Sequence, residues 1–559
     1  MKTRVLLLLG TLVLTLTGCT KQTPVTPSAS EQESTEPSES SESSEEIKEE
    51  KLVGDVAMYD RERYLSTYRG MRMLGEGRAN ETFTKITTDK GSYFAQTNVA
   101  ALAVPVDFTD YKIEDTLLGE EKYREVMQDA IFGSSDDMEW ESLKSYYYKT
   151  SYGQCNITGA VTPTFHINAA ATSFAKDNTA ATKTWAMQIQ EWVKTLDGYN
   201  LADYDKNEDG FVDCLIMLYT PPQHMRGSDD DLFWAFQWST GSTAGTPENP
   251  KVDHFFWASY RFFFENGHYD EAGTYHDWTD DEIRNGTAKP DSHTLIHEFG
   301  HVLSLPDYYN GDYNKQGSDA NCYEPIAGCD MMAHNIGDHN AFSKALYGWV
   351  APYVAQGNAE ITLRSTTDTG EFLIIPCKRT IEETGFYSLL DQYLLVEYLT
   401  PTGVAQYDTT RKYAGTYPQY YSEAGVRICL VDARPGQFTS SGFQGFTSSI
   451  SAGSGYYVSF ACDNNSVDGS CFPNYKLIEV IPNGNRQART LPKNEFGSNS
   501  ILYHEGDWFG SHGNFNNFPF HSTDGTWNSK KGLGEAFGFE LNIKRIDENG
   551  ARIVINELK

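Results

Sequence analysis

The segment SHTLIHEFGHVLSLPD, residues 292–307, carries the most specific pattern in the chain. His297 and His301 are four residues apart, so on a helix they lie on one face and can hold one metal ion. Apolar side chains fall towards the other side, where they can pack against a core. Pro306 ends this helix near residue 304, because the residue before a proline avoids helical geometry.

Glu298 lies about 100° around the helix from His297, beside the ion rather than on it. A carboxylate there is placed to act as general base on water activated by zinc. His293 also precedes His297 by four residues, but it is ~12 Å from His301 along the helix axis. It cannot share an ion with both, so we expect it beside the site or facing solvent. Ser292 is a suitable N-cap.

A third ligand must come from beyond the helix. Asp307 follows His301 by six residues, and this spacing resembles the HExxHxxGxxH/D zinc motif of metzincin peptidases, with aspartate as the last ligand. The glycine of that motif is replaced by Ser304, which reaches a left-handed turn at some cost. Metzincins also carry a methionine turn beneath the metal. Met331 or Met332 could fill that role.

Five ordered segments narrow the resemblance to the immune inhibitor A type of secreted bacterial metallopeptidase. They are VPVDFTD (104–110), SLKSYYYKTSYGQCNITG (142–159), HEFGHVLSLPDYY (297–309), DMMAHN (330–335) and HNAFSKALYGW (339–349). The resemblance implies a zinc endopeptidase with a β-sandwich-like accessory region. It implies His297, His301 and Asp307 as zinc ligands and Glu298 as the base.

An acidic loop is the second possible metal site. Asp205, Asn207 and Asp209 alternate, and Gly210 and Asp213 follow, which resembles the start of an EF-hand. The glutamate at position twelve of an EF-hand is missing, so a full EF-hand is not supported. We expect a structural calcium ion here, with a solvated acidic turn as the alternative.

An oxyanion-stabilising group is not singled out by the sequence. The tyrosines and histidines near the motifs are all candidates, although for the two histidines a place in loops with local hydrogen bonds is the favoured interpretation. The candidates are Tyr308, Tyr309, Tyr323, His334 and His339.

The start of the chain predicts export. Lys2 and Arg4 precede a short apolar run, and the sequence LTGC ending at Cys19 resembles a bacterial lipobox. We expect Cys19 to carry lipid and to anchor the protein at the cell surface. The Ser/Glu-rich stretch that follows cannot offset its ordering entropy by burial, and we expect an extended tether.

The expected fold is a metzincin-like α/β zinc peptidase domain followed by a β-rich, sandwich-like region. The tail of the chain predicts a β-hairpin, because alternating apolar residues flank Asn549-Gly550. The predicted parts are a signal peptide (1–18), a tether (19–52), the peptidase domain (53–350) and the accessory domain (351–559).

Composition limits the partners. The 559 residues carry a net charge of −32, which argues against binding nucleic acid or an anionic membrane through the folded surface. We therefore expect a monomer that acts on proteins or peptides outside the cell and meets the membrane only through its lipid. The alternative is a surface adhesin or carbohydrate-binding lipoprotein on a peptidase-derived fold.

Overall fold

The computed structural model describes most of the chain from residue 51 onward. The described ranges are 51–59, 98–303, 305–311, 323–376, 389–439, 442–446, 457–465, 476–484, 486–510, 519–521, 533–536 and 538–558. The signal peptide, most of the tether, Cys19 and Ser304 lie outside them. Within these ranges, none of the helices has both the length and the apolar character needed to cross a membrane.

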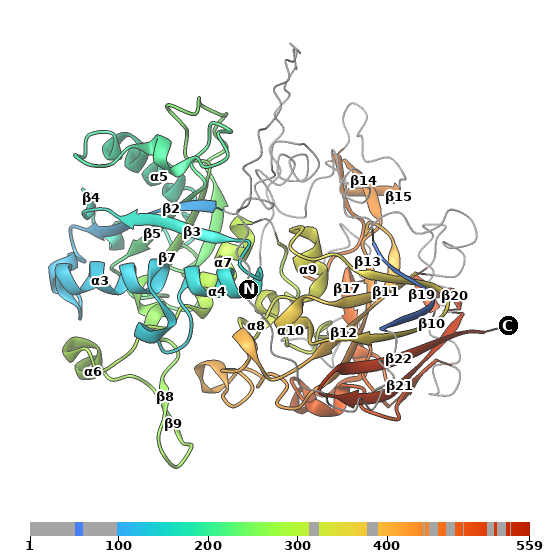
Figure 1. The fold of residues 1–559 in the computed structure, drawn as a ribbon. Coiled ribbons are helices and arrows are strands. Elements are labelled where there is room, and N and C mark those ends of the chain that lie inside the picture. Colours follow the sequence, from blue (N-terminus) through green and yellow to red (C-terminus); the bar gives the residue numbers. More distant parts are fainter. Residues whose placement is uncertain are drawn as a thin grey trace, which may run out of the picture.

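The first half is built on a mixed six-stranded sheet (Figure 1). Its strands are β2 (Asn98–Phe108), β3 (Asn156–Val161), β4 (Phe165–Ile167), β5 (Cys214–Tyr219), β6 (Phe236–Ser239) and β7 (His254–Ser259). The order is β3-β2-β5-β7-β6, with β4 also beside β2. Only β6 is antiparallel to its neighbour. This sheet therefore ends in an antiparallel edge strand.

Pro105 lies inside β2 although proline cannot donate a ladder hydrogen bond. On one side β2 pairs with β3 as far as Ala103 and with β4 from Val106 onward. Pro105 therefore falls where the neighbouring strand changes, which explains how a buried strand accommodates it.

Helices cover both faces of this sheet (Figure 1). Leu102 and Val104 of β2 pack in one core with Trp185 of α5 (Ala181–Val193). Ala101 and Ala103, which point to the opposite face, pack in another core with helices α3 (Gly119–Phe132), α4 (Leu143–Thr150) and α7 (His293–Val302). The α/β organisation expected from the sequence is present, and α7 is the predicted metal-binding helix. Shorter elements complete this half: α6 (Asp280–Asn285), α8 (Met331–His334), α9 (Ala341–Leu346) and the hairpin of β8 (His268–Tyr269) and β9 (Tyr275–His276).

The second half is β-rich and contains a nine-stranded sheet. Its strands are β1 (Leu52–Met58), β10 (Tyr353–Leu363), β11 (Phe372–Pro376), β12 (Gln392–Leu399), β13 (Gly425–Asp432), β17 (Ile478–Val480), β18 (Trp508–Phe509), β21 (Phe539–Asp547) and β22 (Gly550–Glu557). The predicted terminal hairpin is formed by β21 and β22. Smaller elements are α10 (Thr366–Thr369), β14 (Pro435–Thr439), β15 (Gly442–Phe446), β16 (Tyr457–Phe460), β19 (Pro519–His521) and β20 (Leu533–Ala536). A sandwich arrangement of this half remains a prediction.

The large sheet branches at β10. β1 pairs along nearly the whole of β10, so β11 and β22 must share its other edge, at Tyr353–Val354 and Ala359–Leu363 respectively. The sequence placed residues 53–350 in one domain, whereas β1 joins the sheet of the second half. Strand pairing between segments three hundred residues apart leaves no local signal, so the sequence could not indicate that β1 pairs with β10.

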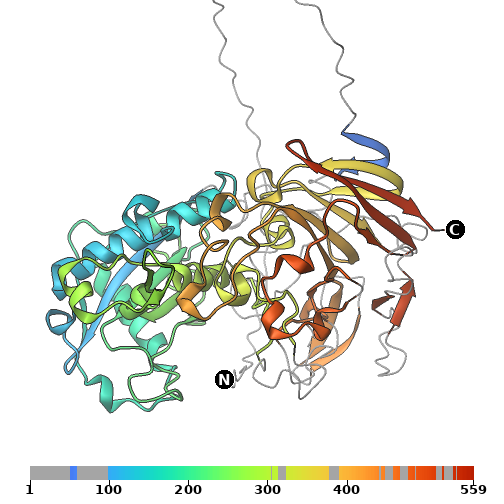
Figure 2. The same cartoon turned by 90° about the horizontal axis from the view of Figure 1, so that it is seen from below.

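A shared core joins the two halves, which lie side by side (Figure 2). Alternate residues of β12 face opposite ways. Tyr393 and Leu395 belong to the same core as Phe299 of α7, whereas Leu394 and Val396 belong to a core inside the second half. The helix α7, which is predicted to bind the metal, therefore packs in a core to which both halves contribute.

Candidate metal centre

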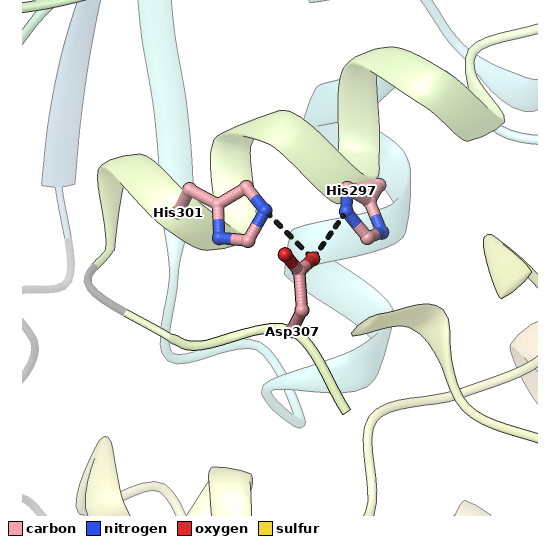
Figure 3. A group of neighbouring side chains, drawn as sticks. All are labelled: His297, His301 and Asp307. Carbon is pink, nitrogen blue, oxygen red and sulfur yellow. Dashed lines mark ion pairs between the residues drawn. The ribbon is translucent and has the colours of Figure 1, made fainter. Parts of the chain in front are cut away.

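Three predicted ligands converge in the structure. His297 and His301 project from α7 towards Asp307, which follows the helix (Figure 3). The Nε2 atoms lie 3.2 and 3.1 Å from Asp307 Oδ1. One ligand atom from each residue falls within 4.8 Å of the others, and no other group of three or more His, Cys, Asp or Glu residues in the described ranges does so. Sequence and structure thus agree on which side chains meet.

The donor atoms suit a divalent metal. His297 Nδ1 lies 2.8 Å from the Met331 carbonyl and His301 Nδ1 lies 2.8 Å from the Leu305 carbonyl. A carbonyl can only accept, so each Nδ1 carries a proton, and in the neutral ring the lone pair is then on Nε2, the atom that faces Asp307. Asp307 Oδ1 is buried and receives no aligned hydrogen bond from the described part of the chain. Ligand atoms ~2.1 Å from a tetrahedral zinc lie roughly 3.4 Å apart, which is close to the spacing observed.

Asp307 is oriented by the second half of the molecule. Its other oxygen, Oδ2, accepts a hydrogen bond of 2.7 Å from the side-chain amide of Asn465. The turn that returns the chain to the site is closed by Leu305, whose N–H donates to the Gly300 carbonyl at 2.9 Å. Asn465 lies 158 residues from Asp307 in the sequence, and no motif marks it.

Glu298 is positioned next to these ligands, with 9% of its surface exposed. Burial raises its pKa, whereas His301 and His297 act in the opposite direction. The backbone N–H of Gln237 on β6 also interacts with the charged form. The two histidines and the edge strand of the sheet are therefore near Glu298, and its burial favours the protonated form.

Met331 and Met332, the two candidates for the methionine turn, make different contacts. Met331 contributes its carbonyl to His297, and both methionines are fully buried. Met332 packs against α7, because a Cβ added to Gly300 would fall only 2.4 Å from its sulfur. Asp330 caps this segment, its Oδ1 accepting from the Met332 N–H at 2.8 Å. The methionine segment thus contacts α7 through the backbone of Met331 and the side chain of Met332.

His293 does not face solvent, so one of the two places expected for it from the sequence is wrong. It is fully buried, and its ring is stacked between Trp140 and Tyr413 with centroids 4.0 and 4.5 Å away. Its Nδ1 lies 2.7 Å from Asp291 and its Nε2 lies 3.3 Å from Asp408. Burial lowers the pKa of His293, but the two carboxylates raise it further, to about 10. A buried cation of this kind cannot be recognised from helix spacing alone.

Ser292 was predicted to cap α7 with its side chain, but its hydroxyl makes no such bond. Ser292 occupies the N-cap position, but its hydroxyl donates to the Ala130 carbonyl at 3.0 Å. The His293 N–H is instead bonded to Asp291 Oδ1 at 3.0 Å. Asp291 therefore serves both the backbone and the ring of His293.

Tyr309 is the oxyanion candidate that adjoins the ligands. Burial raises its pKa, and the neighbouring carboxylates of Asp307 and Glu298 act in the same direction. The other candidates point elsewhere. Tyr308 bonds to Ser343, Tyr323 to Glu479, His334 approaches Glu324, and His339 lies among the rings of Tyr146, Tyr147 and Tyr347.

The acidic loop of residues 205–213 is held together by hydrogen bonds among its own residues. Asp205 accepts from the N–H groups of Asp209 and Gly210, at 3.0 and 2.8 Å. Asn207 donates to Asp209 at 2.8 Å, and Asp213 accepts from the Ala100 N–H at 2.8 Å. The carboxylates do not form a three-residue metal cluster within the described ranges. Calcium binding stays a prediction.

Comparison with known proteins supports the class suggested by this geometry. Residues 87–349 match the family model for the immune inhibitor A peptidase M6 catalytic domain. The protein "Immune inhibitor A" of Bacillus thuringiensis subsp. alesti is 23% identical over 255 residues, which cover 41% of this chain and 32% of that relative. The resemblance to immune inhibitor A-type metallopeptidases is therefore confirmed for this region. The match spans only about a third of the relative's length, as the 32% coverage states.

Proposed function

We propose that this protein is a zinc-dependent endopeptidase. The observation that carries the proposal is the approach of two imidazole Nε2 atoms to Asp307 Oδ1, at 3.2 and 3.1 Å, with Glu298 beside them. His297, His301 and Asp307 would hold the metal. Zinc would polarise the peptide carbonyl and make a water molecule acidic.

Glu298 would accept the proton of the attacking water and pass it to the leaving amine. Burial favours its protonated form, which suits a base that must hold a proton between the two steps. The Tyr309 hydroxyl adjoins Asp307 and would donate to the oxygen that gains charge.

Strand β6 offers a place for the substrate backbone. It is the last strand in its sheet order, and Gln237 on it interacts with Glu298. An extended peptide added along this edge would gain main-chain hydrogen bonds and pass beside the base. Folded proteins would then be cleaved in extended loops rather than in helices.

Export and lipid anchoring through Cys19 remain part of the proposal, resting on the lipobox-like start of the chain. The substrates would then be extracellular proteins. Calcium at Asp205, Asn207, Asp209 and Asp213 is proposed as structural, because the loop leads directly into β5. Chelation with a calcium-selective chelator should lower the melting temperature without removing zinc.

The test uses protein from residue 51 with and without Glu298→Gln. We expect one zinc per chain in both proteins and casein hydrolysis only by the wild type. A correctly folded wild type without zinc would refute the proposal. Bound zinc with no cleavage of casein or of a peptide library would refute the peptidase while leaving a binding protein.

A further inference from the structure

Glu324 is a buried carboxylate that the proposed chemistry does not use. It is 0% exposed, and neither of its oxygens receives a hydrogen bond from the residues that the structure describes. Its ion-pair contact within the described ranges is with His334, whose Nε2 lies 3.5 Å from Oε2. Burying a carboxylate without donors is costly, so a group in this state needs a cation or a donor from elsewhere.

The backbone around Glu324 is held firmly. The Pro325 carbonyl accepts from Val480 on β17 at 2.8 Å, and the Tyr323 hydroxyl bonds to Glu479 on the same strand. The Glu324 carbonyl itself accepts from Ala327 at 3.3 Å. The Glu324 carboxylate is therefore carried by a segment whose two neighbouring residues are bonded to β17.

Glu324 is connected to the candidate metal centre through the short helix α8. His334, whose Nε2 lies 3.5 Å from Glu324 Oε2, is the last of its four residues. Met331, the first residue, lies with its carbonyl 2.8 Å from His297 Nδ1. A group bound at Glu324 would be close to a substrate lying over the metal.

His334 contacts Glu324 and is itself partly exposed. It is the last residue of α8, whose first residue, Met331, fixes His297. Its side chain is 14% exposed, and its contact with Glu324 is longer than an ordinary charge-assisted hydrogen bond. An incoming cation that moved this ring aside would replace a weak contact by a short one.

We propose that Glu324 binds a lysine or arginine side chain of the substrate beside the scissile bond and so determines cleavage specificity. The inference rests on the proposed peptidase function. A basic side chain supplies the positive charge and the N–H donors that both carboxylate oxygens lack. A neutral or acidic residue at that place would leave the carboxylate buried without compensation.

The test compares wild type with Glu324→Gln, which keeps the volume and removes the charge. Matched peptides are acetylated at the amino terminus and differ at one position beside the cleaved bond, carrying lysine, norleucine or glutamate. Glu479→Gln is the control, because that carboxylate lies in the same region but is engaged by Tyr323. Cleavage is read as kcat/KM, and binding is read by fluorescence anisotropy in the Glu298→Gln background.

We expect wild type to prefer lysine over norleucine by at least about thirtyfold and Glu324→Gln to lose most of that preference. Cleavage of the norleucine peptide should change less than about threefold, and zinc content should not change. The same ratio of lysine to norleucine in both proteins would overturn the inference.

The two readouts separate this inference from the proposed function. If no peptide is cleaved but the lysine peptide binds selectively through Glu324, the peptidase proposal fails and the cation site stands. If peptides are cleaved and neither cleavage nor binding responds to Glu324→Gln, only the specificity site fails.

Discussion

Arg427 on β13 and Glu397 on β12 form an ion pair of 2.8 Å in which both side chains are 1% exposed. Arg427 also donates to the Cys329 carbonyl at 2.9 Å, and Glu397 accepts from the Ala341 N–H at 2.8 Å. These two bonds hold the chain on either side of the methionine segment, whose Met331 carbonyl fixes His297. The nine-stranded sheet is thus bonded to the residues that flank the methionine segment beside the candidate metal centre.

Replacing Arg427 by methionine should destabilise the protein by about 3–5 kcal/mol, because Glu397 is left buried without its partner. Zinc affinity should fall as well, since the Cys329 carbonyl loses its donor. Urea unfolding and zinc competition titration check the two effects. Arg364→Met is the control, because Arg364 pairs with Glu371 while its own side chain is 61% exposed. We expect less than about 1 kcal/mol there. Equal losses in both variants would contradict the argument.

The first half should not fold alone. Tyr393 and Leu395 of β12 share a core with Phe299 of α7, so a fragment of residues 98–350 would expose that surface. We expect the fragment to bind a hydrophobic dye, to lack a cooperative thermal transition and to bind zinc weakly. Protein from residue 51 to 559 should show none of these signs. A fragment with a sharp transition and full zinc content would show that the second half is dispensable.

Gly300→Ala tests the contact beneath the helix. Alanine has the better helix propensity by about 1 kcal/mol, but its Cβ would meet the buried sulfur of Met332 at 2.4 Å. Overpacking of this kind costs about 1–3 kcal/mol, so we expect a net loss of stability. Thermal melts of Gly300→Ala, Met332→Ala and the double variant measure the coupling. The double variant should be more stable than the sum of the two single losses implies, whereas additive losses would argue against the contact.

The sequence alone singled out the three side chains that lie together, because their spacing is local. His297, Glu298 and His301 share one helix, and Asp307 follows after one turn, so helix geometry and a recognised motif suffice. The fold was predictable to the level of an α/β half before a β-rich half, since periodicity is local too. What the sequence did not reveal depends on contacts across the chain, such as the hydrogen bond of Asn465 to Asp307 and the pairing of β1 with β10.

Asn465→Ala should weaken zinc binding, because Asp307 loses the donor that orients it at 2.7 Å. Loss of such an outer partner typically costs ten- to a hundredfold in metal affinity, so we expect roughly that range. Zinc competition with a chromophoric chelator measures it. Asn499→Ala is the control, since Asn499 bonds to Ser422 at the surface. An unchanged zinc affinity in Asn465→Ala would mean that the helix and turn orient Asp307 unaided.

His293 makes stability depend on alkaline pH. Asp291 and Asp408 outweigh the effect of burial and raise its pKa to about 10, above the ordinary value of 6.5. A group with a raised pKa binds its proton more tightly in the folded state, so its contribution is complete below pH 6.5 and is lost as the pH rises to 10. The contribution is of the order of 5 kcal/mol.

The free energy of unfolding in urea should therefore fall between pH 7 and pH 10 in the wild type. His293→Gln should be less stable at pH 7 and show a flatter profile, because Gln cannot carry the charge that both carboxylates require. His166→Gln serves as the comparison, since His166 pairs with Asp107 at 2.7 Å but its side chain is 60% exposed. A pH profile of His293→Gln parallel to that of the wild type would show that the buried imidazole is neutral and that Asp291 or Asp408 holds the proton instead.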